Sequence, residues 1–251
     1  MQIVTNESTQ DLSRSRLPEL LDQSSLSLAE TEAALSDLDR VTQWLWGLPP
    51  LYRTLLPRLS RGPPTPWILD IGTGSGFVPS ALAHKLRLLE IGSHCIGVDR
   101  KISHLLFGRK VGHRFLPVVA EAKALPFRDG AVHWSMSTLF FHHFDAEKNR
   151  WILAEMQRVA SEGAVVVDLR RSGVAVLLLK IVLPILGAGS VARADGRLSL
   201  CQAWTISEVQ NLLKDRLVIE LRRRFPFRFS LVLPARQGSW RSPRGGDSCQ
   251  L

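Results

Sequence analysis

Short apolar runs alternate with longer amphipathic segments along the middle of this chain. The apolar runs are each short enough for a buried strand and lie at residues 68–71, 95–98, 132–137 and 164–169. Between and around them, apolar residues recur at helical spacing, at residues 29–46, 51–59 and 147–159, and a helix-compatible run begins at Pro79. This alternation predicts an α/β domain.

Local signals mark where two helices begin. Ser27 with Glu30, and Thr205 with Glu208, have the spacing of a capping box, in which each side chain accepts a hydrogen bond from the other residue's backbone. Pro49-Pro50 is predicted to end the first long helix, since the residue before a proline disfavours helical geometry.

The C-terminal part of the chain changes character. Residues 217–221 and 227–233 are rich in apolar and β-branched residues and predict two strands around Pro226. Residues 235–251 are loop-like in composition, and we expect them to be a disordered tail.

The first apolar run leads directly into a glycine-rich turn. Asp70 lies near the end of this run, and glycines follow at positions 72, 74 and 76. Without Cβ atoms, such a backbone can turn sharply and lie flat against a ligand. The second apolar run ends in Asp99, which suits an acid that reaches ribose hydroxyls. The last two glycines are two residues apart rather than three, which disfavours a nicotinamide dinucleotide site.

Two further segments extend this pattern. Ala120–Phe127 places Glu121 after a third predicted strand, and Phe141-His142-His143 follows the fourth. With Ile68–Gly76 and Asp99, they resemble the class I S-adenosylmethionine-dependent methyltransferases, in particular the branch of the ubiquinone and menaquinone biosynthesis methyltransferases.

The resemblance covers roughly residues 40–234, the size of one domain. It implies a Rossmann-like, mostly parallel seven-stranded sheet in the order 3-2-1-4-5-7-6, with an antiparallel terminal strand and helices on both faces. We expect residues 1–60 to form a helical segment over the cofactor mouth and residues 61–234 to form the methyltransferase domain.

The resemblance also implies S-adenosylmethionine as the cofactor. Asp70 would hold its ammonium group, Asp99 its ribose hydroxyls, and Glu121 with the backbone near Ala122 its adenine. A capping role for the two aspartates is the alternative. Two positions depart from the family pattern, because Glu121 replaces the usual aspartate and Arg100-Lys101 replaces a small or proline-containing turn. The predicted cofactor-binding residues are Asp70, Gly72, Thr73, Gly74, Gly76, Asp99, Arg100, Glu121, Ala122 and Ser137.

His142 and His143 are the candidate catalytic residues. They follow the fourth strand, on the acceptor side, and histidine is the side chain that titrates near neutral pH, so either could act as a base. The alternative is that one packs against the cofactor loop while the other hydrogen-bonds a loop carbonyl. Asp168 and Arg170-Arg171 are further candidates for the acceptor pocket, although a solvated face is the favoured interpretation of the arginines. Four aromatic residues could stack on a planar acceptor, but aromatics at such positions are more often core: Trp44, Trp46, Phe140 and Phe141.

Residues 173–192 form a nearly continuous apolar stretch. Its length approaches that of a membrane span, but Lys180 and Pro184 interrupt it, and a lysine in the middle of a span costs about 3 kcal/mol. We therefore predict a helical insertion at residues 173–204 that covers the acceptor pocket. Contact of residues 173–192 with a membrane surface stays open as the alternative.

Composition and charge narrow the remaining choices. The chain has 251 residues, 45% of them hydrophobic, which suits one domain with a full core. Its net charge of +9 raises nucleic acid or an anionic membrane as a partner, but the basic residues are scattered and few aromatics interleave with them. The densest basic runs are Arg222–Arg224 and the tail from Arg236 to Arg244. Nucleic acid is therefore not the expected partner.

The cysteines and the N-terminus favour a cytoplasmic protein. Cys95, Cys201 and Cys249 are odd in number and far apart, so they specify neither a disulfide framework nor a zinc site, and we predict no metal. The first residues lack the basic start and apolar core of a secretion signal.

We expect this chain to be a methyltransferase that acts on oxygen or carbon of a small, apolar or aromatic acceptor. Two alternatives stay open. A cofactor-binding subunit or scaffold without turnover would be favoured by Glu121 and the Arg100-Lys101 turn, and an RNA methyltransferase would be favoured by the positive charge.

Overall fold

The structure, a computed structural model, describes residues 14–15, 17, 19–22, 26–45 and 47–236. Seven strands form its centre: β1 (Trp67–Ile71), β2 (His94–Asp99), β3 (Leu116–Val119), β4 (Val132–Thr138), β5 (Ala160–Leu169), β6 (Glu220–Arg224) and β7 (Arg228–Pro234).

The strands make one sheet in the order β3-β2-β1-β4-β5-β7-β6. Neighbouring strands among β1 to β5 pair in parallel, whereas β7 pairs antiparallel with both β5 and β6. The predicted strand order and antiparallel end are therefore confirmed. Because parallel strands point the same way, the ends of β1, β2, β4 and β5 share one edge of the sheet, where ligands bind in open α/β sheets.

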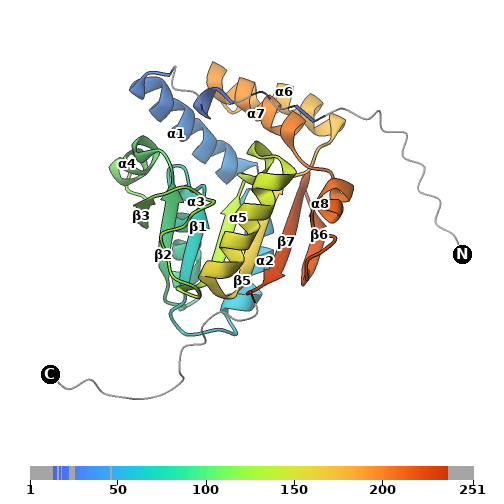
Figure 1. Cartoon of the computed structure of the whole chain (residues 1–251). Coiled ribbons are helices and arrows are strands. Elements are labelled where there is room, and N and C mark those ends of the chain that lie inside the picture. Colours follow the sequence, from blue (N-terminus) through green and yellow to red (C-terminus); the bar gives the residue numbers. More distant parts are fainter. Residues whose placement is uncertain (1–13, 16, 18, 23–25, 46, 237–251) are drawn as a thin grey trace, which may run out of the picture.

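Helices cover both faces of the sheet (Figure 1). On one face pack α2 (Leu48–Leu59) and α3 (Phe77–Arg87), with Ile68 of β1 in their hydrophobic core. On the other pack α5 (Ala146–Val159) and α8 (Ile206–Leu212), with Leu69. Successive side chains of a strand point to opposite faces, so the continuous apolar run of β1 fills both cores. A further helix, α4 (Ile102–Lys110), contacts β2 and β3.

Three helices lie across one end of the sheet in Figure 1: α1 (Leu28–Trp44), α6 (Gly173–Ile185) and α7 (Ser190–Gln202). Short 3-10 turns at Leu20–Asp22 and Phe141–His143 contact α7. The segment predicted as a helical insertion, residues 173–204, contains the two helices α6 and α7. The chain turns between them at Gly187, whose φ of +69° favours glycine.

Most predicted element ends lie within two residues of the observed ones, but β5 begins at Ala160, four residues before the predicted start at Ala164. Both capping boxes are present, at Ser27 and Thr205. Pro49-Pro50 lies in the first turn of α2, where proline's missing N–H costs nothing, rather than only ending α1. Strand β6 begins at Glu220, three residues after the expected position, and includes Arg222–Arg224. These charges blunt the open edge of the sheet.

In the part of the chain that the structure describes, no helix is both long and apolar enough to cross a bilayer. Most of the predicted disordered tail, from residue 237 onward, lies outside the described residues.

Candidate active site

The glycine loop follows β1 and is tied to the end of β2. The backbone N–H groups of Gly72 and Thr73 both donate to the carbonyl of Val98, each at 2.9 Å. The three glycines all have left-handed φ angles, of +72° at Gly72, +56° at Gly74 and +75° at Gly76. Other residues pay a steric penalty there, so the sequence requires glycine for this loop shape.

The three glycines differ in what surrounds them. A Cβ atom on Gly72 would come 2.2 Å from the ring of Phe140, and one on Gly76 equally close to the ring of Phe115. A Cβ on Gly74 would meet nothing within 4 Å. Gly72 and Gly76 are therefore required by internal packing, whereas Gly74 borders open space at the ends of β1 and β2.

Asp70 brings a buried carboxylate to this loop. It is 2% exposed, and its Oδ2 accepts a 2.7 Å hydrogen bond from the Thr73 hydroxyl. Its Oδ1 has no hydrogen-bond partner among the described residues. Burial, assisted by the nearby charge of Asp99, raises the pKa of Asp70 to about 7 despite the Thr73 hydrogen bond. A buried, unpartnered carboxylate oxygen suits a cationic group such as the ammonium of S-adenosylmethionine.

Asp99 ends β2 on the other side of the loop. Its Oδ2 accepts the N–H of Gly74 at 2.9 Å and its Oδ1 that of Lys101 at 2.8 Å. Nδ1 of the buried His104 lies 3.7 Å from Oδ1. Each carboxylate oxygen can accept a second hydrogen bond, so Asp99 fixes the loop and could still accept ribose hydroxyls.

The remaining predicted cofactor residues lie at different depths. The N–H of Ala120 donates to the Asp99 carbonyl, and this bond places the exposed Glu121 and half-buried Ala122 beside the end of β2. Arg100 is exposed next to Asp99. Ser137 is instead buried, and its hydroxyl donates to the Ile71 carbonyl at 2.9 Å, so here it braces β4 against β1.

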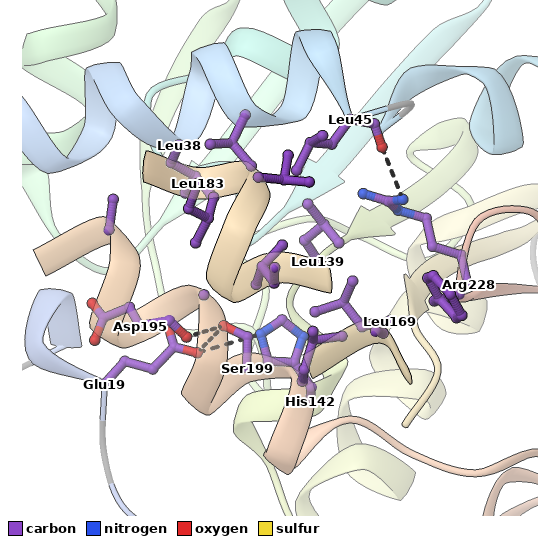
Figure 2. Close-up of a pocket in the computed structure, with 18 of the residues that line it drawn as sticks. Glu19, Leu38, Leu45, Leu139, His142, Leu169, Leu183, Asp195, Ser199 and Arg228 are labelled. Atoms are coloured by element: carbon purple, nitrogen blue, oxygen red, sulfur yellow. Dashed lines mark hydrogen bonds and ion pairs between the residues drawn. The ribbon is translucent and has the colours of Figure 1, made fainter. Parts of the chain in front are cut away.

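An apolar cavity of about 350 Å³ lies beside the ends of β4 and β5 (Figure 2). Helices α1, α6 and α7 supply most of its wall, and Leu139 and Leu169 close it at the strand ends. The helical lining includes Leu38, Val41, Ala175, Val182, Leu183 and Leu200. This cavity has the size and apolar character of a small-molecule site.

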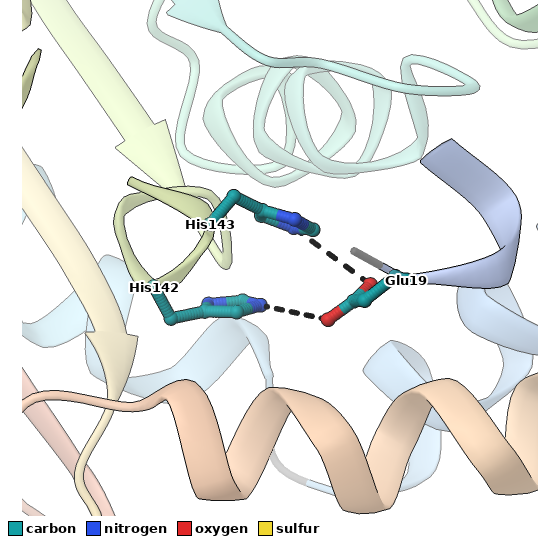
Figure 3. A group of neighbouring side chains, drawn as sticks. All are labelled: Glu19, His142 and His143. Carbon is teal, nitrogen blue, oxygen red and sulfur yellow. Dashed lines mark ion pairs between the residues drawn. The ribbon is translucent and has the colours of Figure 1, made fainter. Parts of the chain in front are cut away.

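Polar groups gather at one side of this cavity (Figure 3). Nδ1–H of His142 donates to Asp168 at 2.7 Å, and the backbone N–H of His142 donates to the same carboxylate at 3.1 Å. Nε2 of His142 lies 3.6 Å from Oε1 of Glu19, and Nε2 of His143 lies 3.9 Å from its Oε2. The two imidazole rings stack with centroids 4.4 Å apart. Ser199 donates a further hydrogen bond to Glu19.

The opposite charges in this cluster determine the protonation of His142, Asp168 and Glu19. Burial lowers the pKa of His142, but the charge of Asp168 and hydrogen bonds with Asp168 and Glu19 together outweigh it and raise that pKa to about 10. Both carboxyl groups are buried, which disfavours their charge, yet the histidines hold the pKa values of Asp168 and Glu19 below their ordinary ones. His142 is therefore positively charged at neutral pH, between two carboxylates.

Glu19, His142 and His143 also bring potential ligand atoms within 4.8 Å of one another, so these described residues could hold a metal ion. A metal would have to displace the proton on Nε2 of His142. The ion pairs already neutralise the cluster without one. We therefore assign it to charge balance and to orienting the histidines.

Leu139 and Phe140 connect the cavity to the glycine loop. Leu139 has a φ of +55°, an uncommon conformation for a residue with a branched side chain, and its N–H donates to the Val167 carbonyl at 3.0 Å. Leu139 lines the cavity, whereas the ring of Phe140 covers Gly72. The two sites are thus neighbours, separated by one strained residue.

Several residues that line the cavity, or that hold the turn containing His142, could not be identified from the sequence. Glu19 and Ser199 belong to no motif, and neither does Arg14, whose guanidinium donates to the carbonyls of His142 and Phe144 at 2.7 and 2.6 Å and lies 4.2 Å from the ring centroid of Trp204. Arg14 and Glu19 lie far along the chain from Ser199 and from the histidines. No local pattern marks them.

Arg228 of β7 was also missed. It is 6% exposed, lines the cavity, and donates from Nη1 to the carbonyls of Leu45 and Pro226 at 3.1 and 3.2 Å. Its buried Nε has no hydrogen-bond partner among the described residues. Burial lowers the pKa of Arg228 to about 10, so the side chain remains charged at neutral pH.

The other candidate residues for the acceptor pocket differ in burial and in whether they line the cavity. Asp168 is fully buried behind His142, and the interpretation of a solvated face is wrong for Arg171, which pairs with Glu208 at 2.7 Å and is nearly buried. Phe141 is core, as the favoured interpretation predicts, whereas that interpretation is wrong for Trp44, which is exposed and lines the cavity. Trp46 lies outside the described residues.

Comparison with known proteins agrees with this geometry. Residues 68–163 match a family model described as a methyltransferase domain. No curated protein matches the chain. The matched segment runs from β1 through the first residues of β5, so it contains the glycine loop, Asp70, Asp99 and both histidines.

Solved structures share the fold at low sequence identity. A SAM-dependent methyltransferase from Aquifex aeolicus is 16% identical, with a TM-score of 0.56, over 84% of this chain and 100% of that one. A putative S-adenosylmethionine-dependent methyltransferase from Methanococcus maripaludis is 14% identical, with a TM-score of 0.58, over 85% and 96%. A chain from a complex of the Haloferax volcanii Trm112 methyltransferase activator with a putative methyltransferase is 17% identical, with a TM-score of 0.54, over 81% and 96%.

Residues 68–163 therefore match a methyltransferase domain, and the described residues have a Rossmann-like class I methyltransferase fold. S-adenosylmethionine is the cofactor that the domain and the loop geometry support.

Proposed function

We propose that this chain, which carries a class I methyltransferase domain, transfers the methyl group of S-adenosylmethionine to a small apolar or aromatic acceptor. An oxygen of a phenol-like hydroxyl or a carbon of a related ring would receive it. The observation that carries the proposal is the apolar cavity next to the glycine loop, with Leu139 and Phe140 between them. Fold alone does not fix the acceptor, so the proposal depends on this site.

Binding and orientation would be the main tasks of the protein. The cofactor, when bound, supplies a methyl group already activated by a sulfonium. Asp70 would pair with its ammonium, and Asp99 would accept its ribose hydroxyls. The apolar cavity wall would hold the acceptor atom about 3 Å from the methyl group and exclude water.

Between the two histidines, we assign the proton-accepting role to His143. His142 is held as a cation between Asp168 and Glu19, so it is a positioning residue that fixes the turn after β4. His143 lines the same cavity and stacks on His142, with Glu19 3.9 Å from its Nε2. An acceptor hydroxyl that reaches His143 could lose its proton to this ring.

Arg228 would recognise a second oxygen of the acceptor. Its unpartnered Nε–H is a buried donor in the cavity lining, and such groups cost stability unless a ligand or water completes them. An aromatic hydroxyl compound with a carbonyl or carboxylate substituent therefore suits the cavity better than an unsubstituted phenol.

A methyl-transfer assay tests the proposal. The purified full chain is incubated with radiolabelled S-adenosylmethionine and a panel of phenols and quinols, with and without a carbonyl or carboxylate group. We expect label in at least one aromatic acceptor and higher kcat/KM for those with the second oxygen. His143→Gln should lower kcat without changing cofactor affinity, whereas His84→Gln, at an exposed histidine on α3, should change neither.

The two alternative functions give different results in the same experiment. Cofactor binding by calorimetry without label in any small acceptor would support a scaffold or subunit. Label in RNA, with RNA affinity that falls steeply with salt, would support RNA methylation.

A further inference from the structure

Helix α6 is apolar on both sides. Ala175, Val182 and Leu183 line the cavity on its inner side. On its outer side, Val174, Leu177, Ile181 and Ile185 are 61%, 62%, 57% and 77% exposed. A helix that is apolar all round is normally buried in a core or in lipid, so the outer side of α6 lacks the covering that its composition calls for.

This outer side continues to the mouth of the cavity. Leu178 and Trp44 both line the cavity and are exposed, at 46% and 64%, so they lie where the cavity meets solvent. Phe225 is 71% exposed and adjoins Pro226, another lining residue. Tryptophan and other aromatic side chains are typical of protein surfaces at a membrane interface.

The exposed charges on α6 and α7 themselves have one sign. Between residues 172 and 202, the exposed charged side chains are Lys180, Arg193 and Arg197. The one acid in this range, Asp195, is buried, where its carboxylate accepts the N–H groups of Leu20 and Leu21. The α6–α7 pair therefore presents apolar and cationic side chains together, as helices do that lie on anionic lipid.

We propose that the outer face of α6 docks on an anionic lipid bilayer and that a lipophilic acceptor enters the cavity from that bilayer. The helix would lie in the plane of the surface, with Val174, Leu177, Ile181 and Ile185 in the headgroup region. The second part rests on the proposed function, because it assigns a source to the acceptor. The first part can be tested without turnover.

A second copy of the chain is a less suitable occupant. In a twofold dimer the same patch faces itself, so Lys180, Arg193 and Arg197 of the two copies would be brought toward one another. An anionic surface suits both the apolar outer side of α6 and the cationic residues of α6 and α7.

Flotation with vesicles tests the docking. The full chain is mixed with vesicles of phosphatidylcholine alone or with added phosphatidylglycerol, at about 0.1 M and about 1 M salt. We expect binding to the anionic vesicles that weakens at high salt. Leu177→Glu with Ile181→Glu should weaken it about tenfold or more, because neither residue lines the cavity and both face outward. Lys180→Glu with Arg193→Glu should remove the preference for anionic lipid.

A matched control uses Leu88→Glu with Leu106→Glu, at leucines 64% and 61% exposed outside α6. This pair should change vesicle binding by about twofold or less. The proposal is overturned if the wild-type chain ignores anionic vesicles, or if the α6 pair binds like the control. A dimer in analytical ultracentrifugation that the α6 pair dissolves would assign the face to a second copy instead. Methyl transfer to a water-soluble acceptor, measured in parallel, reports the proposed function separately.

Discussion

The glycine loop and the acceptor cavity of this chain differ in which parts of the sequence form them and in which interactions hold them. The loop takes its residues from one continuous stretch, Ile68–Gly76, and holds its shape through backbone hydrogen bonds and left-handed glycines. The cavity takes its lining from segments as distant as Glu19 and Arg228, and most of it is aliphatic. The loop contains little side-chain surface that could vary, whereas each aliphatic residue of the cavity wall can be exchanged for another apolar one.

The two sites should therefore bind their ligands in different ways. A polar site made of backbone and two carboxylates fits one charged ligand closely. An apolar cavity of the same molecule selects by shape and by a few polar groups, here Glu19, the histidines and Arg228. The family match, residues 68–163, contains the loop but not α1, α6 or α7, which build most of the cavity. Changes in one site should therefore leave the other intact.

Filling the cavity should have the largest effect. Ala175→Trp places a large ring in the acceptor space and should lower kcat/KM at least about 100-fold, because misplacing an acceptor by about 1 Å can cost that much. Cofactor affinity, measured by calorimetry, should stay within about twofold. Val174→Trp, at the neighbouring outward position, is the control and should leave kcat/KM with a soluble acceptor nearly unchanged. Equal losses in both variants would contradict the position of the cavity.

Removing a loop carboxylate should act on the cofactor alone. Asp99→Ala deletes an acceptor for the Gly74 and Lys101 amides and for ribose, and should weaken cofactor binding about 30-fold, equivalent to about 2 kcal/mol. Asp215→Asn, at an exposed acid, serves as the matched control. If Asp99→Ala binds cofactor like wild type, this carboxylate is only a cap.

Substitutions at two glycines with positive φ angles can separate the effect of backbone strain from the effect of contact with the cofactor. Gly74→Ala and Gly112→Ala both force alanine into a left-handed conformation, at +56° and +88°, where neither Cβ meets an atom within 4 Å. Each should lower the free energy of unfolding by about 1 kcal/mol. Only Gly74→Ala should also weaken cofactor binding, by about 20-fold, since its Cβ would occupy ligand space. Calorimetry with chemical unfolding measures both quantities, and matched cofactor affinities would remove Gly74 from the site.

Acidity should affect the loop through Asp70. Its folded-state pKa of about 7 exceeds the ordinary value, so it takes up a proton as pH falls through 7, and a protonated carboxyl cannot pair with an ammonium. Cofactor affinity should fall about tenfold from pH 8 to pH 6.

The same carboxyl should have the opposite effect on stability without cofactor. Because its folded pKa is raised, its contribution is fully present below the unfolded-state value and is lost as pH rises through 7. Asp70→Asn should therefore bind cofactor weakly at both pH values but unfold at higher denaturant than wild type at pH 8. A pH-independent affinity in wild type would show that Asp70 does not meet the cation.

The same contrast explains what could be predicted from the sequence. The strands near Asp70 and Asp99, the glycine loop and the two capping boxes depend on neighbours in the chain, so local patterns identify them. The predicted start of β6 was wrong because this edge strand contains three consecutive arginines, which do not form an apolar run. The pairing of His142 with Glu19 and Asp168 could not be predicted from the sequence, because it joins residues from three separate segments of the chain.

A crystal structure with S-adenosylhomocysteine, the product left after methyl transfer, tests the central claim most directly. We predict its amino group at Asp70, its ribose at Asp99 and its sulfur facing the cavity beside Leu139 and His143. A nucleoside bound elsewhere, or a sulfur that points to solvent away from Leu139, would contradict the account.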